Sequence, residues 1–150
     1  IGADHAGFQL KEGIKPFLAE MGFAVTDAGT DSDRPVDYPD FGARVAEAVS
    51  TGLFPRGILI CGSGIGMSIT ANRFPGVRAA LCLDEETARF SRQHNDANIL
   101  VLAGRKTDTK TARAITRVWL TTPFEGGRHQ KRLNKIRETE LKMGEKTGHE

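Results

Sequence analysis

The chain has 150 residues, of which 39% are hydrophobic and 27% are charged, as in an ordinary globular domain. This length predicts one domain over 1–150 with a real core, and the apolar runs are too short to span a membrane. A net charge of +2 gives no general case for nucleic-acid binding. Two cysteines, Cys61 and Cys82, do not make a disulfide framework, and no basic-then-apolar leader is visible. We therefore expect a cytoplasmic protein that binds neither nucleic acid nor membrane.

Apolar periodicity and turn residues divide the chain into alternating strands and helices. Strands are predicted at 1–3, 23–27, 57–61, 77–83 and 99–103. Helices are predicted at 8–21, 40–51, 65–72, 85–93, 109–120 and from about 128 onward. Pro16 should kink or shorten the first helix, and Asp40 can cap the second. Because Ile1-Gly2-Ala3 looks like the end of a strand, we expect a few residues before it, and we expect the end from Gly144 to Glu150 to fray.

This alternation predicts βαβ units and an α/β fold. We expect a Rossmann-like three-layer α/β/α sandwich with a five-stranded parallel sheet and an extra C-terminal helix at about 126–150. In such sheets ligands bind beyond the carboxyl ends of the strands. Polar clusters that we expect to converge there on one crevice are Asp4-His5, Cys61 to Gly66, His94-Asn95 and Gly104-Arg105.

The stretch from Ile58 to Ser68 carries the strongest chemical signal. An apolar run ends in Cys61, alternating glycines follow, and a helix begins. Loop amides and a helix N-terminus can activate a thiol and hold an anionic intermediate. The alternatives are a buried structural thiol, which is our interpretation of Cys82, and a dinucleotide loop, although the spacing is GxGxG and not GxGxxG. A phosphatase of the Cys-five-residues-Arg type is excluded because Met67 stands at the Arg position.

The histidines His5 and His94 are either solvated loop residues or groups that act as acid, base or phosphate ligand. Asp4 can orient an imidazole or accept a sugar hydroxyl, and Tyr38 is either a core residue or part of a pocket wall. With no CxxC or HxxxH pattern and four separated histidines, we predict no metal site.

Two arginines begin the last helix. Arg128 and Arg132 are i,i+4 neighbours and can point the same way, which suits one phosphate group. The alternative is a solvated helix face, which is our interpretation of Lys131, Lys135 and Lys142.

Five motifs in order resemble those of the type B ribose-5-phosphate isomerases, a group that also contains the galactose-6-phosphate isomerase subunits. The resemblance covers about residues 1–137, and its motifs are GADHAGFQLK, DYPDF, ILICGSGIGMSI, SRQHNDANIL and EGGRHQKR. It implies an aldose–ketose isomerase for phosphorylated sugars that uses no cofactor, metal or nucleotide.

The resemblance also implies roles for individual residues. Cys61 would be the base that moves a proton between C1 and C2, and His94 would open the sugar ring. The loop that would hold the enediolate consists of Gly62, Ser63, Gly64, Ile65 and Gly66, with Ser63 assisting. Substrate contacts would come from Asp4, His5, Tyr38, Asn95 and Arg105, and phosphate contacts from His5, Arg105, Arg128 and Arg132.

Members of this group are dimers or tetramers with sites shared between subunits. The resemblance therefore implies a homodimer or a dimer of dimers, in which residues near His94 come from the partner chain. Ribose 5-phosphate and ribulose 5-phosphate are the substrates that it favours. An isomerase of a hexose 6-phosphate (allose or galactose 6-phosphate) and a non-catalytic sugar-phosphate sensor remain alternatives.

Overall fold

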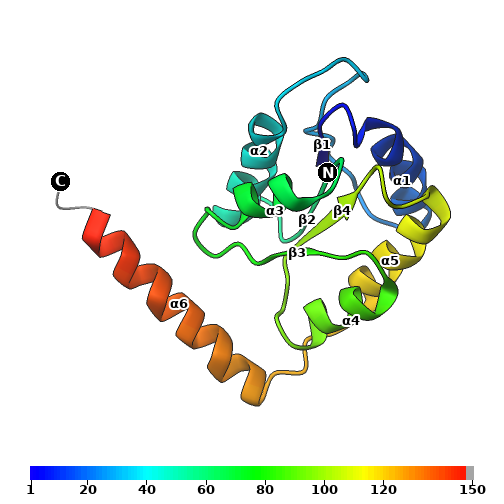
Figure 1. Cartoon of the computed structure of the whole chain (residues 1–150). Coiled ribbons are helices and arrows are strands. Elements are labelled where there is room, and N and C mark those ends of the chain that lie inside the picture. The colour runs from blue at the N-terminus through cyan, green and yellow to red at the C-terminus, as the bar shows by residue number, and fades with distance from the viewer. Residues whose placement is uncertain (148–150) are drawn as a thin grey trace.

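A computed structural model describes residues 1–147. Its sheet has four parallel strands in the order β1-β2-β4-β3 (Figure 1). The strands are β1 (Gly2–Ala3), β2 (Gly57–Cys61), β3 (Ala79–Leu81) and β4 (Ile99–Ala103). The central strands β2 and β4 are buried along their whole length, which explains their unbroken apolar sequences GILIC and ILVLA.

Six helices are described, and two apolar clusters divide most of them between the faces of the sheet. Residues of α1 (Phe8–Glu20), α4 (Glu85–Gln93) and α5 (Thr109–Thr121) share one cluster with Ile58, Ile60, Leu100 and Leu102. Residues of α2 (Tyr38–Ser50) and α3 (Ile65–Ala71) share the other with Leu59, Cys61, Ile99 and Val101. Neighbouring residues of β2 and β4 fall in different clusters because successive side chains of a strand point to opposite faces of the sheet. This alternation turns the side chain of Cys61 toward α2 and α3.

The prediction of a fifth strand at 23–27 is wrong. This segment follows Gly22, whose φ of +88° ends α1 as a glycine after a helix commonly does. The end of the segment does lie beside the first residues of the chain, because the Ile1 amino group donates to the Thr26 carbonyl at 2.9 Å. Just after the segment, the Ala28 amide donates to the Ile1 carbonyl at 2.8 Å and the Thr30 amide to the Ala3 carbonyl at 3.0 Å. The side chains of the segment are mostly exposed and β1 has only two residues, so these few bonds do not make a regular ladder.

Other predicted boundaries need smaller corrections. Helix α2 begins at Tyr38 and not at Asp40, because Pro39 has no N–H to satisfy and suits the first turn. Helix α1 continues through Pro16 to Glu20 and is not shortened there. The strand predicted at 77–83 is confined to Ala79–Leu81.

The last helix, α6 (Arg128–Thr147), extends away from the sheet and the other helices (Figure 1). Its residues are exposed along nearly the whole length, and His129 is the only one that is buried. The prediction that the end frays is wrong for residues 144–147, which continue the helix, and the rest of that prediction lies outside the described residues. No helix within residues 1–147 is long and apolar enough to cross a membrane.

Candidate active site

Strand β2 brings the thiol to its carboxyl end. Cys61 is the last residue of the strand, is not in a disulfide and is only 4% exposed. Its carbonyl accepts a hydrogen bond from the Gly104 amide at 2.8 Å, and the next carbonyl, of Gly62, accepts one from the Arg105 amide at 3.0 Å. The segment that follows β4 is therefore fixed beside the thiol.

The loop after Cys61 presents backbone donors. The amides of Gly62, Ser63, Gly64 and Gly66 have no acceptor within residues 1–147, whereas the Ile65 amide donates to Ser63 Oγ at 3.2 Å. Gly64 has a φ of +78°, and a Cβ there would lie 2.4 Å from Leu81 Cδ1, so this turn requires glycine. Because α3 has only seven residues, the loop amides contribute more than its dipole to holding negative charge.

Residues that follow β1 lie at the same edge of the sheet. The Asp4 amide donates to the Ile60 carbonyl at 3.2 Å, and Asp4 Oδ1 accepts from the Gly7 amide at 3.1 Å. His5 Nδ1 accepts a hydrogen bond from the Val36 amide at 3.1 Å. That bond assigns the proton of a neutral His5 ring to Nε2, which leaves Nε2 free to donate to a ligand.

Two further side chains complete this group. The guanidinium of Arg105 lies close to Gly62, where a Cβ would be 3.3 Å from Nη1, and the ring of Tyr38 packs against Gly66. We call Asp4, His5, Tyr38, Arg105 and the 61–66 loop the thiol half-site. Asp4, His5 and Arg105 follow the carboxyl ends of β1 and β4, and Tyr38 begins α2, so the structure places them at the same edge of the sheet as Cys61.

The predicted convergence of His94 and Asn95 on the same crevice is wrong within one chain. These residues precede β4, whereas Arg105 follows it, so they lie at the opposite edge of the sheet. In the β2–β4 register Gly57 pairs with Ile99 and Cys61 with Ala103. The two pairs are four residues apart along the strands, which corresponds to about 13 Å. Cys61 is at one end of this length, and His94 lies beyond the other end.

The first turn of α6 lies next to His94. The imidazole ring of His129, on this turn, stacks on that of His94 with the centroids 4.4 Å apart. In the linker before α6, the Glu125 amide donates to the Gln93 carbonyl at 3.1 Å. The predicted phosphate ligands Arg128 and Arg132 are on this same turn, away from Cys61. We call His94, Asn95, Arg128, His129 and Arg132 the histidine half-site. His129 was not among the predicted site residues, although the motif EGGRHQKR contains it.

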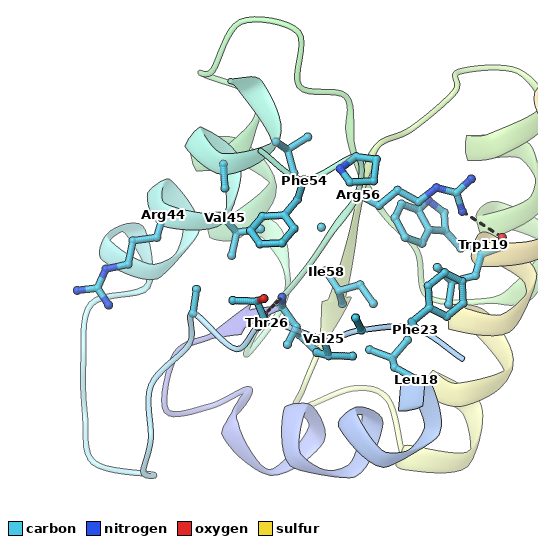
Figure 2. A pocket seen from close by; sticks show the side chains of 18 residues that line it. Leu18, Phe23, Val25, Thr26, Arg44, Val45, Phe54, Arg56, Ile58 and Trp119 are labelled. Atoms are coloured by element: carbon cyan, nitrogen blue, oxygen red, sulfur yellow. Dashed lines mark hydrogen bonds between the residues drawn. The ribbon is translucent and has the colours of Figure 1, made fainter. Parts of the chain in front are cut away.

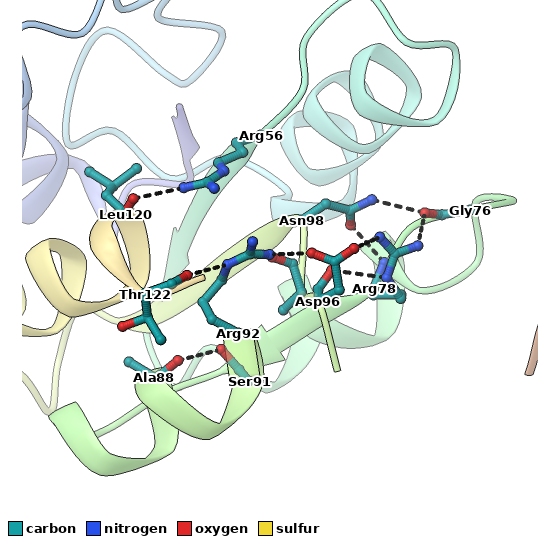
Figure 3. A network of polar contacts seen from close by, with 11 residues as sticks. Arg56, Gly76, Arg78, Ala88, Ser91, Arg92, Asp96, Asn98, Leu120 and Thr122 are labelled. Carbon is teal, nitrogen blue, oxygen red and sulfur yellow. Dashed lines mark hydrogen bonds and ion pairs between the residues drawn. The ribbon is translucent and has the colours of Figure 1, made fainter. Parts of the chain in front are cut away.

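A polar network holds the loop that carries His94 (Figure 3). The buried Arg92 donates from Nη1 to Asp96 Oδ1 at 2.9 Å and to the Ala97 carbonyl at 2.7 Å. Arg78 Nε donates to the Asp96 carbonyl at 2.9 Å. These bonds stabilise Asp96 at a φ of +45°, which is uncommon for a residue other than glycine. The turn that leads from His94 into β4 is therefore held from both sides.

Two histidines of the histidine half-site and the neighbouring Glu125 are potential metal ligands that their sequence spacing does not suggest. One ligand atom each of His94, Glu125 and His129 lies within 4.8 Å of the others. The two imidazole rings are stacked 4.4 Å apart with their planes at 12°, so their in-plane lone pairs lie in two separate, nearly parallel planes and do not converge on one position. Arg128 and Arg132 add positive charge next to them. This arrangement does not favour a cation.

A cavity of about 260 Å³ lies away from both half-sites (Figure 2). It is at the amino end of β2, where Gly57 and Ile58 line it together with Phe23, Phe54 and Trp119. Its wall is mostly apolar. The guanidinium of Arg56 lies over the Trp119 ring and already donates to the Leu120 carbonyl at 3.0 Å. This cavity offers no cluster of groups suited to a sugar phosphate.

A comparison with known families identifies the group to which the chain belongs. The family model described as "Ribose/Galactose Isomerase" matches residues 1–136. The chain therefore belongs to the ribose/galactose isomerase family, and the resemblance that the five motifs indicated is confirmed.

Individual relatives are similar over nearly their whole length. Ribose-5-phosphate isomerase B of Escherichia coli (strain K12) is 47% identical over 135 residues, which cover 90% of this chain and 91% of that protein. The solved structure of Clostridium thermocellum ribose-5-phosphate isomerase B has a TM-score of 0.93 at 51% identity, and the match covers 95% of this chain and 96% of that one. The D-erythrulose-4-phosphate isomerase of Pectobacterium atrosepticum is 41% identical over 138 residues, which cover 91% of this chain and 90% of that protein.

Proposed function

We propose that this protein interconverts ribose 5-phosphate and ribulose 5-phosphate, with Cys61 as the base and without metal or nucleotide. The observation that carries the proposal is the position of the Cys61 thiol directly before a loop of unpaired amides. Removing a proton from carbon beside a carbonyl creates an enediolate, and such amides are suited to stabilise that negative charge. The family and the relatives named above support the same reaction.

The first step is the opening of the furanose ring by His94. The hemiacetal hydroxyl at C1 loses its proton, the bond from C1 to the ring oxygen O4 breaks, and O4 gains a proton. One imidazole can accept the first proton and donate the second, because a histidine side chain can act as both general base and general acid. The product is the open-chain aldehyde.

The second step is the proton transfer between carbons. The Cys61 thiolate removes the proton from C2, which gives a cis-enediolate, and the thiol returns a proton to C1. A proton moves from O2 to O1 in the same step, so the aldose becomes the ketose with no net change in atoms. The amides of Gly62, Ser63, Gly64 and Gly66, with the Ser63 hydroxyl, would hold the enediolate oxygens. The Ile65 amide, which donates to Ser63 Oγ at 3.2 Å, would orient that hydroxyl.

Substrate binding is assigned to the remaining residues of the two half-sites. Asp4, Tyr38 and Asn95 would contact the sugar hydroxyls, and His5, Arg105, Arg128 and Arg132 would bind the phosphate. The phosphate is remote from C1 and C2, so its binding energy can hold an otherwise flexible open chain in a reactive position.

The separation of the half-sites supports a shared active site. Because His94 and Cys61 lie at opposite edges of one sheet, we propose a homodimer, or a dimer of dimers, in which the histidine half-site of one subunit completes the thiol half-site of its partner. We also propose a cytoplasmic protein with a single domain. The two apolar clusters support the three-layer α/β/α arrangement.

An isomerisation assay with no added metal or NAD tests the function. Ribose 5-phosphate should give ribulose 5-phosphate, and allose 6-phosphate, galactose 6-phosphate and erythrulose 4-phosphate should react more slowly. A faster reaction with one of the other sugars would change the assigned substrate. Binding of ribose 5-phosphate with no turnover of any sugar would instead indicate a sensor.

A further inference from the structure

The ring of His94 lies in the middle of a stack of three rings. Its centroid is 5.0 Å from that of Phe90, with the planes 12° apart, and 4.4 Å from that of His129, also at 12°. Phe90 comes from the last turn of α4, and His129 from the first turn of α6. Both faces of the imidazole are therefore covered, and only its edge, which carries the two nitrogens, is left for other partners.

We propose that His129, with Phe90, positions the ring of His94 for opening the sugar ring, and that the start of α6 thereby controls this step. This inference rests on the proposed function, because it concerns the ring-opening role of His94. Neither stacking residue has to touch the sugar: they are positioning residues that restrict rotation of the His94 ring and keep its edge directed at the substrate.

The burial of His129 supports this role. It is 6% exposed, while every other described residue of α6 is less buried. Its Nε2 has no hydrogen-bond partner within residues 1–147, and the nearest acid, Glu125 Oε2, is 3.5 Å away. A buried polar atom without a hydrogen bond costs free energy, so hydrogen bonding does not explain the placement of this ring. Apart from the long contact with Glu125, the His129 ring interacts by stacking on the His94 ring.

Electrostatics favour an uncharged His129 in the stack. Burial lowers the pKa of His129, and the nearby His94 and Arg128 lower it further, while Glu125 opposes them. A neutral ring beside His94 avoids a pair of stacked cations when His94 carries a proton during ring opening. Arg132 also lowers the pKa of His129.

The test separates ring opening from carbon chemistry. Ribulose 5-phosphate cannot form a furanose ring, because its C5 oxygen is esterified, so exchange of its C1 hydrogen with deuterium from solvent requires Cys61 but no ring opening. The variants His129→Leu and His129→Phe are compared in the full-length protein, with Lys131→Leu as a surface control on the same helix turn. Each is measured for turnover of ribose 5-phosphate and, by NMR, for C1 exchange in ribulose 5-phosphate.

The stack predicts that His129→Leu lowers turnover of ribose 5-phosphate by about tenfold to a hundredfold, as expected for a misplaced acid–base group, while exchange falls less than threefold. His129→Phe, which keeps a ring but no nitrogen, should restore most of the lost turnover. Equal losses of turnover and exchange in a folded His129→Leu protein would overturn the proposal, as would unchanged turnover. If the unmodified protein catalyses neither reaction, the proposed function itself fails.

Discussion

The ring of Tyr38 packs directly on the backbone of Gly66. A Cβ at Gly66 would lie 2.5 Å from both Cε2 and Cζ of that ring and 3.0 Å from Cε1. The contact joins the first residue of α2 to the first turn of α3, so the tyrosine rests on the loop that follows Cys61. Glycine at position 66 thus permits the Tyr38 ring to lie against the 61–66 loop of the thiol half-site.

This contact predicts the effect of Gly66→Ala. The added methyl group displaces the Tyr38 ring, which we expect to lower kcat/KM for ribose 5-phosphate about tenfold or more and stability by about 1–3 kcal/mol. Gly144→Ala is the matched control, because no atom lies within 4 Å of its added Cβ and the position is helical. In a Tyr38→Ala background the stability cost of Gly66→Ala should disappear. A cost that persists there would show that the clash is not with Tyr38.

The two cysteines form a matched pair for testing the base. Cys61→Ser should lower turnover by about 10³-fold, because a hydroxyl is a far weaker base than a thiolate. Cys82 is buried away from the glycine loop, and burial raises the pKa of its thiol to about 11, so it stays protonated near neutral pH. Cys82→Ser keeps a donor for the Ala80 carbonyl and should retain turnover. Circular dichroism establishes that both proteins are folded, and rapid turnover by folded Cys61→Ser would contradict the role of Cys61.

The separation of the half-sites predicts complementation between two inactive variants. Cys61→Ala has an intact His94, and His94→Asn has an intact Cys61. In a mixed dimer with shared sites, one site therefore contains both native residues and the other contains neither. Random mixing makes half of the dimers mixed, so about a quarter of the sites recover.

The measurement is turnover after the two proteins are unfolded together and refolded. Each variant refolded alone gives the baseline, and the doubly substituted Cys61→Ala/His94→Asn protein mixed with the native chain controls for the refolding yield. No gain in activity on mixing would show that each active site is built within one subunit.

A cluster remote from the catalytic groups predicts a stability change in acid. Burial tends to raise the pKa of Asp27, but hydrogen bonds from Lys11 and Lys15 and from the Gly29 amide outweigh it and lower the pKa to about 2, from 3.8. The folded state thus binds this proton less readily than the unfolded state. Its stabilising effect is present above about pH 4 and is lost as the pH falls toward 2, with an upper limit of about 2 kcal/mol.

Urea unfolding at a series of pH values measures this effect. The free energy of unfolding of the native chain should fall between pH 4 and pH 2 more steeply than that of Asp27→Asn. Asp31→Asn, in the exposed loop that follows, provides the control. Parallel curves for the native chain and Asp27→Asn would show that the ion pairs of Asp27 do not contribute to acid stability.

Most of the local elements, and the grouping of residues around Cys61, could be predicted from the sequence alone. Unbroken apolar runs indicated that 57–61 and 99–103 are buried strands, and parallel strands place the residues after them at one edge, which brought Cys61, Arg105 and Asp4 together. The segment at 23–27 was misjudged because its apolar residues suit a strand. Whether such a segment becomes a strand depends on the backbone hydrogen bonds that it forms with a neighbour. This segment and the residues after it form only a few bonds with the first residues of the chain.

Only the tertiary structure decided where His94 lies. A motif shows that His94 and Arg128 belong to a site, but not at which edge of the sheet each one stands. That depends on their order relative to β4 and on how the linker before α6 joins Gln93. The stacking of His129 on His94 is equally invisible in the sequence, because 35 positions separate them and their contact depends on the folded path of β4 and α5 between them.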